Sequence, residues 1–310
     1  DYVAGSGTIN FAGTNGETQQ LTITVNGDEM VELDQTFTVG FSNLIASGRP
    51  ITIPSQGTGT ITNDDFATVT IANISANENS GLQTFTATLD KQVDGGFSVD
   101  VSTVDGTATT ADSDYTAVTS QTLTFVGNLG ETQTFTVTPI ADNKVEADEN
   151  LTITMNNLGA TSLTATEINT SVVASYTIQN DDAATVTIEN VTVNEGDGAT
   201  IMTLTLNNEV QGGFSVDVST LDGTATAAGV DYATIVSQTE TFAGTAGETQ
   251  TVIVAIGNDP FGEETEMFSL TMSGLTPFSA SASAIDITDT ATITILDDDA
   301  PVLLSLTPMD

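Results

Sequence analysis

The sequence predicts an all-β protein built from tandem antiparallel β-sandwiches of immunoglobulin-like kind, each with seven strands. Threonine alternates with Val, Ile, Leu or Phe along the chain, as in Thr134-Phe-Thr-Val-Thr138. This period of two is typical of a strand with one buried face. Clusters of Asp, Asn and Gly separate these stretches, and no helical period interrupts them. The whole pattern recurs along the chain, so each copy is expected to form one sandwich.

Short motifs define the repeat. The acidic clusters at Asn63, Asn180 and Asp297 follow one another at intervals of 117 residues. A period of this length exceeds the roughly 20–50 residues of a solenoid unit and instead indicates a row of whole domains. Two further motifs repeat in the same way: Gly-Glu-Thr-Gln begins at Gly16, Gly130 and Gly247, and Asp-Tyr begins at Asp1, Asp114 and Asp231.

The register of these motifs divides the chain into four segments. Residues 1–66 are expected to be the C-terminal part of copy one, residues 67–183 copy two, and residues 184–300 copy three; residues 301–310 would form the first strand of a further copy. Both ends fall inside a repeat, so we expect an excerpt of a longer repeat protein. In copy two the strands are predicted at residues 67–72, 82–89, 97–103, 121–126, 131–138, 150–156 and 172–179.

The composition excludes several functions. The chain has 42 acidic and 3 basic residues, a net charge of −39, and neither His nor Cys. A Ser-His-Asp triad, a Cys nucleophile and a zinc site of thiolates or imidazoles are therefore excluded. Three basic side chains cannot neutralise a phosphate backbone, so no nucleic-acid partner is expected. No apolar stretch reaches 18 residues, so this segment is not expected to insert into a membrane.

The acidic residues are predicted to converge at one pole of each sandwich. If the chain reverses at every connection, the first, third and fifth connections and the end of the last strand share a pole. In copy two this pole receives Glu78, Asp114, Asp142, Glu146, Asp148, Glu149, Asp181 and Asp182. Copy three repeats it with Glu195, Asp231, Asp259, Glu263, Glu264, Glu266, Asp297, Asp298 and Asp299. Copy one retains Asp1, Asp28, Glu29, Glu32, Asp34, Asp64 and Asp65.

This convergence indicates a cation site. Carboxylates gathered at one pole repel each other at neutral pH unless a cation lies among them. Oxygen ligands without nitrogen or sulfur select Ca²⁺ or Mg²⁺, and irregular loops suit the 6–8 ligands of Ca²⁺ better than the octahedron of Mg²⁺. The alternative interpretation is a set of solvated surface acids. Carboxylate pairs also occur in glycoside hydrolases, but no Trp and few aromatic residues are present to form a sugar platform, so no enzyme is expected.

The chain resembles the Calx-β repeat, a calcium-binding sandwich of sodium–calcium exchangers and large bacterial surface proteins. The residues of copy two that carry this resemblance are Glu78, Thr103-Val-Asp-Gly-Thr-Ala-Thr109, Asp114-Tyr115, Thr124-Phe125, Gly130-Glu-Thr-Gln133, Asp142, Glu146-Ala-Asp-Glu149 and Asn180-Asp-Asp182.

The resemblance implies a calcium ligand set in each copy. In copy two the ligands would be Glu78, Asp114, Asp142, the carbonyl of Lys144, Glu146, Glu149, Asn180, Asp181 and Asp182. In copy three they would be Glu195, Asp231, Asp259, the carbonyl of Phe261, Glu263, Glu266, Asp297, Asp298 and Asp299. In copy one they would be Asp1, Asp28, the carbonyl of Met30, Glu32, Asn63, Asp64 and Asp65.

The chain also departs from the exchanger pattern. An acidic position is Gly27, Ala141 or Asn258 in the three copies, and the last Glu of the pattern is Gln35 in copy one. These changes imply fewer ions or weaker binding than in the most acidic members of the family.

The expected function is that of a calcium-stabilised, adhesive stalk in a large extracellular protein of the bacterial cell surface. Ca²⁺ would stiffen the junctions, because no Gly/Ser or Pro linker separates the copies. The expected partners are the neighbouring repeats and a surface or glycan target that the sequence does not identify. Two alternatives remain: a regulatory calcium sensor of a membrane protein, and a subunit of an extracellular fibre that contacts other copies of the chain.

Overall fold

A computed structural model describes residues 1–53 and 56–299 of the chain. Apart from three 3-10 turns at Glu78–Ser80, Glu195–Asp197 and Ala282–Ala284, its regular structure is entirely β. The predicted all-β class and the tandem sandwiches are therefore confirmed. None of the helical turns in the described residues is long enough to cross a membrane. The strand expected at residues 301–310 lies outside the described residues.

Copy two forms a sandwich of two five-stranded sheets. One sheet has the order β11-β3-β5-β9-β7 and the other β4-β12-β10-β6-β8. The strands of the first sheet are β3 (Ala67–Ile71), β5 (Gln83–Leu89), β7 (Tyr115–Thr116), β9 (Thr132–Pro139) and β11 (Ile168–Asn169). Those of the second are β4 (Ile74–Asn77), β6 (Phe97–Val104), β8 (Gln121–Phe125), β10 (Glu149–Gly159) and β12 (Ala174–Gln179).

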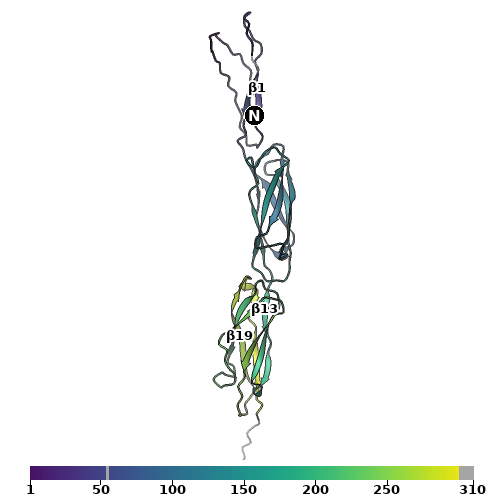
Figure 1. Cartoon of the computed structure of the whole chain (residues 1–310), viewed down its shortest axis with the longest axis vertical. Coiled ribbons are helices and arrows are strands. Elements are labelled where there is room, and N and C mark those ends of the chain that lie inside the picture. The colour runs from purple at the N-terminus through teal and green to yellow at the C-terminus, as the bar shows by residue number, and fades with distance from the viewer. Residues whose placement is uncertain (54–55, 300–310) are drawn as a thin grey trace, which may run out of the picture. The chain divides into compact units, whose positions relative to one another are not determined.

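Copy three has a similar arrangement with four strands in its first sheet, and Figure 1 labels one strand of each of its sheets, β13 and β19. Its sheets have the orders β18-β15-β13-β20 and β14-β21-β19-β16-β17. The strands of the first sheet are β13 (Ala184–Ile188), β15 (Ala199–Leu206), β18 (Thr249–Ala255) and β20 (Ile285–Asp286). Those of the second are β14 (Val191–Asn194), β16 (Phe214–Leu221), β17 (Gln238–Phe242), β19 (Glu266–Pro277) and β21 (Thr290–Leu296).

The alternation of residues along each strand builds the sandwich. In β5 and β9 the inward pair Phe85 and Phe135 stacks with ring centroids 5.3 Å apart, while the outward neighbours Thr86 and Thr134 pair on the exposed face. Copy three has a stack of the same kind between Phe214 and Phe242, with centroids 4.9 Å apart. Strand pairs of this type are the units that stabilise a sheet.

The structure differs from the predicted strand list at the first connection. Each of the seven predicted strands of copy two overlaps an observed one, and the two-residue strands β7 and β11 are additional. The first predicted strand is also followed by a short additional strand, β4, in the opposite sheet. Its counterpart in copy three, β14, pairs in parallel with β21. Because parallel strands end at the same edge, this additional strand brings the chain to the pole where β21 ends.

Copy one contains a smaller ordered element. Strands β1 (Gln35–Val39) and β2 (Gly57–Ile61) pair antiparallel, with Gln35 opposite Ile61. Tyr2 and Val25 add an isolated bridge, and the ring of Tyr2 stacks on Phe37 with centroids 4.9 Å apart.

The compact units of the chain do not coincide with the sequence repeats. One unit comprises Asp1–Ser75, Leu82–Thr138 and Asn150–Thr177; the other comprises Ala76–Gly81, Pro139–Glu149 and the chain from Ile178 onward. Three acidic segments of copy two, residues 76–81, 139–149 and 178–182, therefore group with copy three. These segments carry most of the ligands predicted for copy two.

Candidate metal centre

Each complete copy holds two groups of three carboxylates. In every group, one oxygen from each residue lies within 4.8 Å of the other two. We call the groups that contain a residue of a 3-10 turn the turn clusters, and the other two the loop clusters. The turn clusters are Glu78, Asp142 and Asp182 in copy two, and Glu195, Asp297 and Asp299 in copy three. The loop clusters are Asp114, Glu146 and Glu149 in copy two, and Asp231, Glu263 and Glu266 in copy three.

Strand register assembles the turn cluster of copy three. Parallel pairing places Asn194 opposite Leu296, so the next residues, Glu195 and Asp297, leave the sheet side by side. The 3-10 turn then fixes Glu195, because the Asp197 carboxylate accepts a hydrogen bond from the Asn194 N–H at its start. The additional strand that sequence reasoning missed is therefore the element that presents this glutamate.

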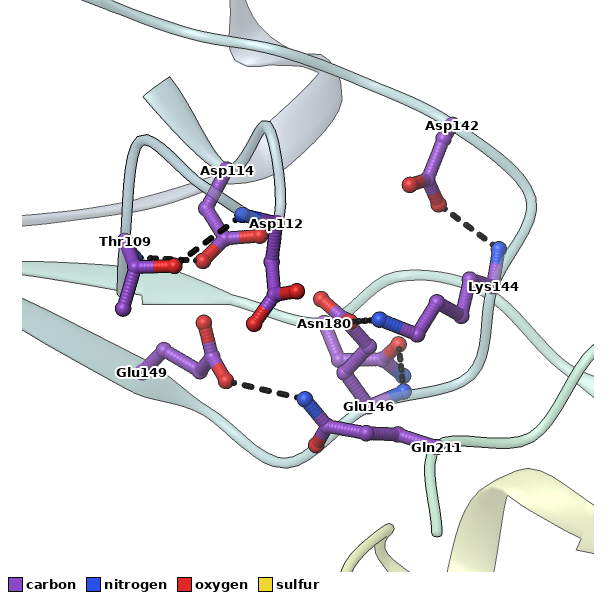
Figure 2. A network of polar contacts seen from close by, with 9 residues as sticks. All are labelled: Thr109, Asp112, Asp114, Asp142, Lys144, Glu146, Glu149, Asn180 and Gln211. Atoms are coloured by element: carbon purple, nitrogen blue, oxygen red, sulfur yellow. Dashed lines mark hydrogen bonds and ion pairs between the residues drawn. The ribbon is translucent and has the colours of Figure 1, made fainter. Parts of the chain in front are cut away.

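Local hydrogen bonds hold the loop-cluster aspartates. Asp114 Oδ2 accepts the N–H of Thr109 at 2.6 Å, and Asp231 Oδ2 accepts that of Thr226 at 2.7 Å. The next residue in each copy is a tyrosine whose hydroxyl donates to an aspartate ten residues upstream; for Tyr115 this acceptor is Asp105. These paired contacts fix the loop at both copies in the same way. Figure 2 also shows Asp112, which the sequence analysis did not select; its N–H donates to Thr109 Oγ1 at 3.1 Å.

The turn clusters contain buried carboxylate oxygens that accept no hydrogen bond from any residue that the structure describes. They are Glu78 Oε1 and Asp182 Oδ2 in copy two, and Glu195 Oε2 and Asp299 Oδ2 in copy three. The same two positions are orphaned in both copies. A buried charged oxygen without a partner is costly, and two ionised carboxylates cannot donate to each other. A cation or a proton between them would remove this cost.

Burial and this repulsion together raise the pKa of several cluster carboxylates. Burial, followed by the charges of Asp182 and Asp142, raises the pKa of Glu78 to about 8. Burial, followed by the Asp231 carboxylate, raises the pKa of Glu266 to about 7. Burial is also the first cause of the raised pKa of Asp182, Glu195, Glu263 and Asp299, with neighbouring carboxylates adding to it in each case.

The donor set fits a hard divalent cation. Every side chain in the four clusters offers carboxylate oxygen, the ligand type of Ca²⁺ and Mg²⁺. An Asx turn shapes the acidic loop in each copy: the N–H of Lys144 donates to Asp142 Oδ1 at 2.7 Å, and that of Phe261 to Asp259 Oδ1 at 2.8 Å. In copy one the corresponding bond joins Met30 to Asp28 at 3.0 Å. The carbonyl ligands expected at these three positions remain a prediction.

The side chain of Asn180 holds the acidic loop and the end of the last strand together through two hydrogen bonds. Its Oδ1 accepts the N–H of Glu146 at 2.9 Å, and its Nδ2 donates to the carbonyl of Asp182 at 2.9 Å. Asn63 repeats both bonds with Glu32 and Asp65. The counterpart in copy three, Asp297, has no amide to donate and joins the turn cluster instead.

Some of the predicted residues belong to no group of three, although, after burial, the charges of Asp259, Asp181 and Asp298 still raise the pKa of cluster members. Asp259, Asp181 and Asp298 lie outside the groups of three, as do all the predicted ligands of copy one within the described residues. Copy one has Gln35 at the position of Glu149. Asp148 and Asp34 accept the N–H of Asn180 and Asn63 at 3.1 and 3.0 Å, so both brace the end of the last strand.

Lys144 places a cation at the pole of copy two. Its ammonium forms an ion pair with the carboxylate of Glu146, and Figure 2 shows the two side chains reaching each other across the loop. The corresponding residues are Met30 and Phe261, so copy three has no side-chain cation at this point. The two loop clusters therefore differ in charge although their carboxylates correspond one to one.

Comparison with known proteins identifies the repeat. The family model of the Calx-beta domain matches residues 1–65, 62–182 and 179–299. The solved structure entitled "Crystal structure of CBD12 from CALX1.2" is 18% identical and covers 74% of this chain and 99% of that one, with a TM-score of 0.34. "Crystal structure of Apo-form Calx CBD1 domain" is 23% identical and covers 38% and 100%, with a TM-score of 0.33. No curated protein matches the sequence.

The raised pKa of Glu78 predicts that the metal-free chain becomes less stable as pH rises. The unfolded chain loses this proton near pH 4.5, while the folded chain holds it up to about pH 8. The folded state therefore binds more protons within this window, and stability falls as pH rises. We expect the melting temperature in chelator to decrease from pH 5 to pH 8. Saturating Ca²⁺ should abolish the decrease, and Glu78→Gln should reduce it; Glu189→Gln, at an exposed site, should not.

The ion pair at Lys144 predicts that copy two binds a divalent cation less tightly than its carboxylates allow. In Lys144→Met the loop cluster loses a competing cation. Its affinity for Ca²⁺ in calorimetric titration should rise about fivefold or more, because this largely buried ion pair is less screened than exposed pairs, which contribute up to about 1 kcal/mol. Lys91→Met is the matched control, because Lys91 pairs with Glu29, which belongs to no carboxylate group of the described chain. An equal rise in both variants would contradict this interpretation.

Proposed function

Because the chain belongs to the Calx-beta family, we propose that its turn and loop clusters bind Ca²⁺ and that it is a structural repeat segment. The orphaned oxygens of the turn clusters carry this proposal. They occupy equivalent positions in both complete copies: Glu78 corresponds to Glu195, and Asp182 corresponds to Asp299. Solvated surface acids would not place the same buried, unpartnered oxygens in two copies.

Calcium fits the site better than magnesium. The ligands come from irregular loops and a turn, and they offer several carboxylates at distances that a flexible shell can adjust. Ca²⁺ accepts such shells of 6–8 oxygens, whereas Mg²⁺ demands a strict octahedron and retains its water. When bound, Ca²⁺ would supply the positive charge that these carboxylates lack, and the residues of each cluster would hold it.

Calcium binding would stiffen the connection between the repeats. Three acidic segments of copy two belong to the same compact unit as copy three, and β13 begins at Ala184, two residues after Asp182. Neutralising the carboxylates would order these segments and stiffen the connection between the repeats. Extracellular calcium modules bind at about 10⁻⁴–10⁻³ M, so millimolar calcium outside a cell would keep the clusters loaded.

We propose that the chain serves as part of a stalk in an extracellular protein of the bacterial surface. The recurrence of the same motifs in tandem copies and the absence of a flexible linker favour a supporting element over an isolated sensor. Three basic residues in 310 also leave few cleavage sites for trypsin-like proteases, which suits an exposed position.

Thermal unfolding tests the calcium proposal. A ligand that binds only the folded state stabilises it by about 2.7 kcal/mol per site at a concentration of 100 Kd. We therefore expect Ca²⁺ to raise the melting temperature and chelator to reverse the rise. Glu195→Gln should reduce the gain from calcium, whereas Glu189→Gln, in the same repeat and exposed, should leave it intact. Equal melting temperatures in calcium and in chelator would refute calcium binding.

Small-angle scattering tests the mechanical proposal. In Ca²⁺ the chain should behave as a stiffer particle than in chelator, because removing the ions restores repulsion among the carboxylates that join copies two and three. The measurement is the change in flexibility and maximum dimension between the two conditions. Mg²⁺ at the same concentration controls for simple charge screening. Identical profiles in calcium and chelator would contradict the stiffening role while leaving calcium binding untouched.

A further inference from the structure

One residue of the acidic loop of copy two belongs to the core of copy three. Val145 lies between Asp142 and Glu146, yet its side chain is completely buried among the core residues of the following repeat. Its backbone is paired as in a strand: its N–H donates to the carbonyl of Glu209 at 2.8 Å, and its carbonyl accepts the N–H of Gln211 at 2.9 Å. Val145 and Val210 thereby form an isolated parallel bridge.

Copy one repeats this contact with copy two. Val31 is also completely buried, and it forms a parallel bridge with Val93. Its N–H donates to the carbonyl of Gln92, and its carbonyl accepts the N–H of Asp94, both at 2.9 Å. The same residue of the acidic loop is therefore inserted at both junctions with the same pair of hydrogen bonds.

The receiving surface is preformed by glycines. Val93 and Val210 each precede a Gly-Gly-Phe sequence, and their N–H groups donate to the carbonyls of Gly127 and Gly244 at 2.9 and 2.8 Å. Gly127 and Gly244 have φ of +95° and +96°, and a Cβ at these positions would lie 2.0 and 2.1 Å from the carbonyl oxygens of Val93 and Val210. Only glycine fits there. We call this surface the socket and the inserted valine the peg.

Side chains beside the peg change in a complementary way between the first junction, of copies one and two, and the second junction, of copies two and three. At the second junction, Gln211 donates from Nε2 to Glu149 at 3.3 Å, as Figure 2 shows. The corresponding residues of the first junction are Asp94 and Gln35, so the amide and the carboxylate have changed places.

A second pair changes in the same way. The ion pair of Lys91 with Glu29, 2.6 Å long, corresponds to the neutral residues Asn208 and Asn143. Paired changes of this kind indicate surfaces that recognise each other.

Copy three lacks the peg. The residue that corresponds to Val31 and Val145 is Gly262, between Phe261 and Glu263. The acidic loop of copy three thus retains the aspartate and glutamates of its neighbours but offers no side chain to a socket.

Resting on the calcium proposal above, we propose that the peg couples calcium binding in one repeat to the stability of the next. The partner that fits the socket is the acidic loop of a preceding repeat with a β-branched residue at this position. The backbone of Val145 stays paired only while its loop is ordered, and repulsion between Asp142 and its cluster partners opposes that order until a cation is bound. Coupling of this kind is reciprocal, so docking also tightens calcium binding.

A double-mutant cycle in the full chain tests the coupling. Glu78→Gln weakens the turn cluster of copy two, and Val145→Gly gives its loop the residue found in copy three. Hydrogen exchange at the N–H groups of Val210 and Gln211 reports on the socket, at a Ca²⁺ concentration that just saturates the unsubstituted chain. With the valine present, Glu78→Gln should lower protection at both amides about fivefold or more, the lower range of typical couplings. In the Val145→Gly background the same substitution should have no effect on Val210.

Controls separate the two proposals. Calorimetric titration with Ca²⁺ is performed on each variant, and Glu189→Gln serves as a charge control within copy three. A chain that binds Ca²⁺ but shows the same effect of Glu78→Gln in both backgrounds overturns the coupling alone. A chain that binds no Ca²⁺ overturns both proposals. If copy three shows no protection at all in Val145→Gly, Val145→Ala takes its place in the cycle, with a reduced effect of Glu78→Gln expected.

Discussion

The repulsion among buried carboxylates at the pole of each sandwich governs the rest of the structure. Glu78 and Asp182, like Glu195 and Asp299, present oxygens that no neighbouring donor satisfies. The β framework imposes this proximity, because the register of β14 and β21 releases Glu195 and Asp297 at the same edge. The chain has 42 acidic and 3 basic residues, so it cannot neutralise these clusters from its own side chains. Its stability must therefore depend on what the surrounding solution provides, either protons or metal ions.

The sequence predicted the architecture and the location of the acids for clear physical reasons. A period of two records which side of a strand faces the core, and the 117-residue repeat shows that the acids recur in register with the strands. Reversal of the chain at each connection then suffices to gather Asp114, Glu146 and Glu149 at one end. All three lie in one group in the structure.

Other features depend on register and packing, which no local pattern records. In the sequence, the short strand β4 cannot be told from the end of β3. Only its pairing partner shows that it lies in the other sheet. The sequence predicts Asn180 as a ligand, and it does not show the two hydrogen bonds of its amide with Glu146 and Asp182. Val145 reads as one apolar residue in an acidic loop, and its burial depends on a socket 65 residues further along the chain.

The bridge between Val145 and Val210 has a consequence for a chain placed under tension. Pulling on the acidic loop must break two backbone hydrogen bonds and expose an apolar side chain to water before the loop can lengthen. The anchored loop therefore resists extension until these contacts break together. A glycine in the same place, as at Gly262, would let the loop extend with little resistance. One side chain per repeat thus decides whether the acidic loop is anchored to the sandwich that follows it.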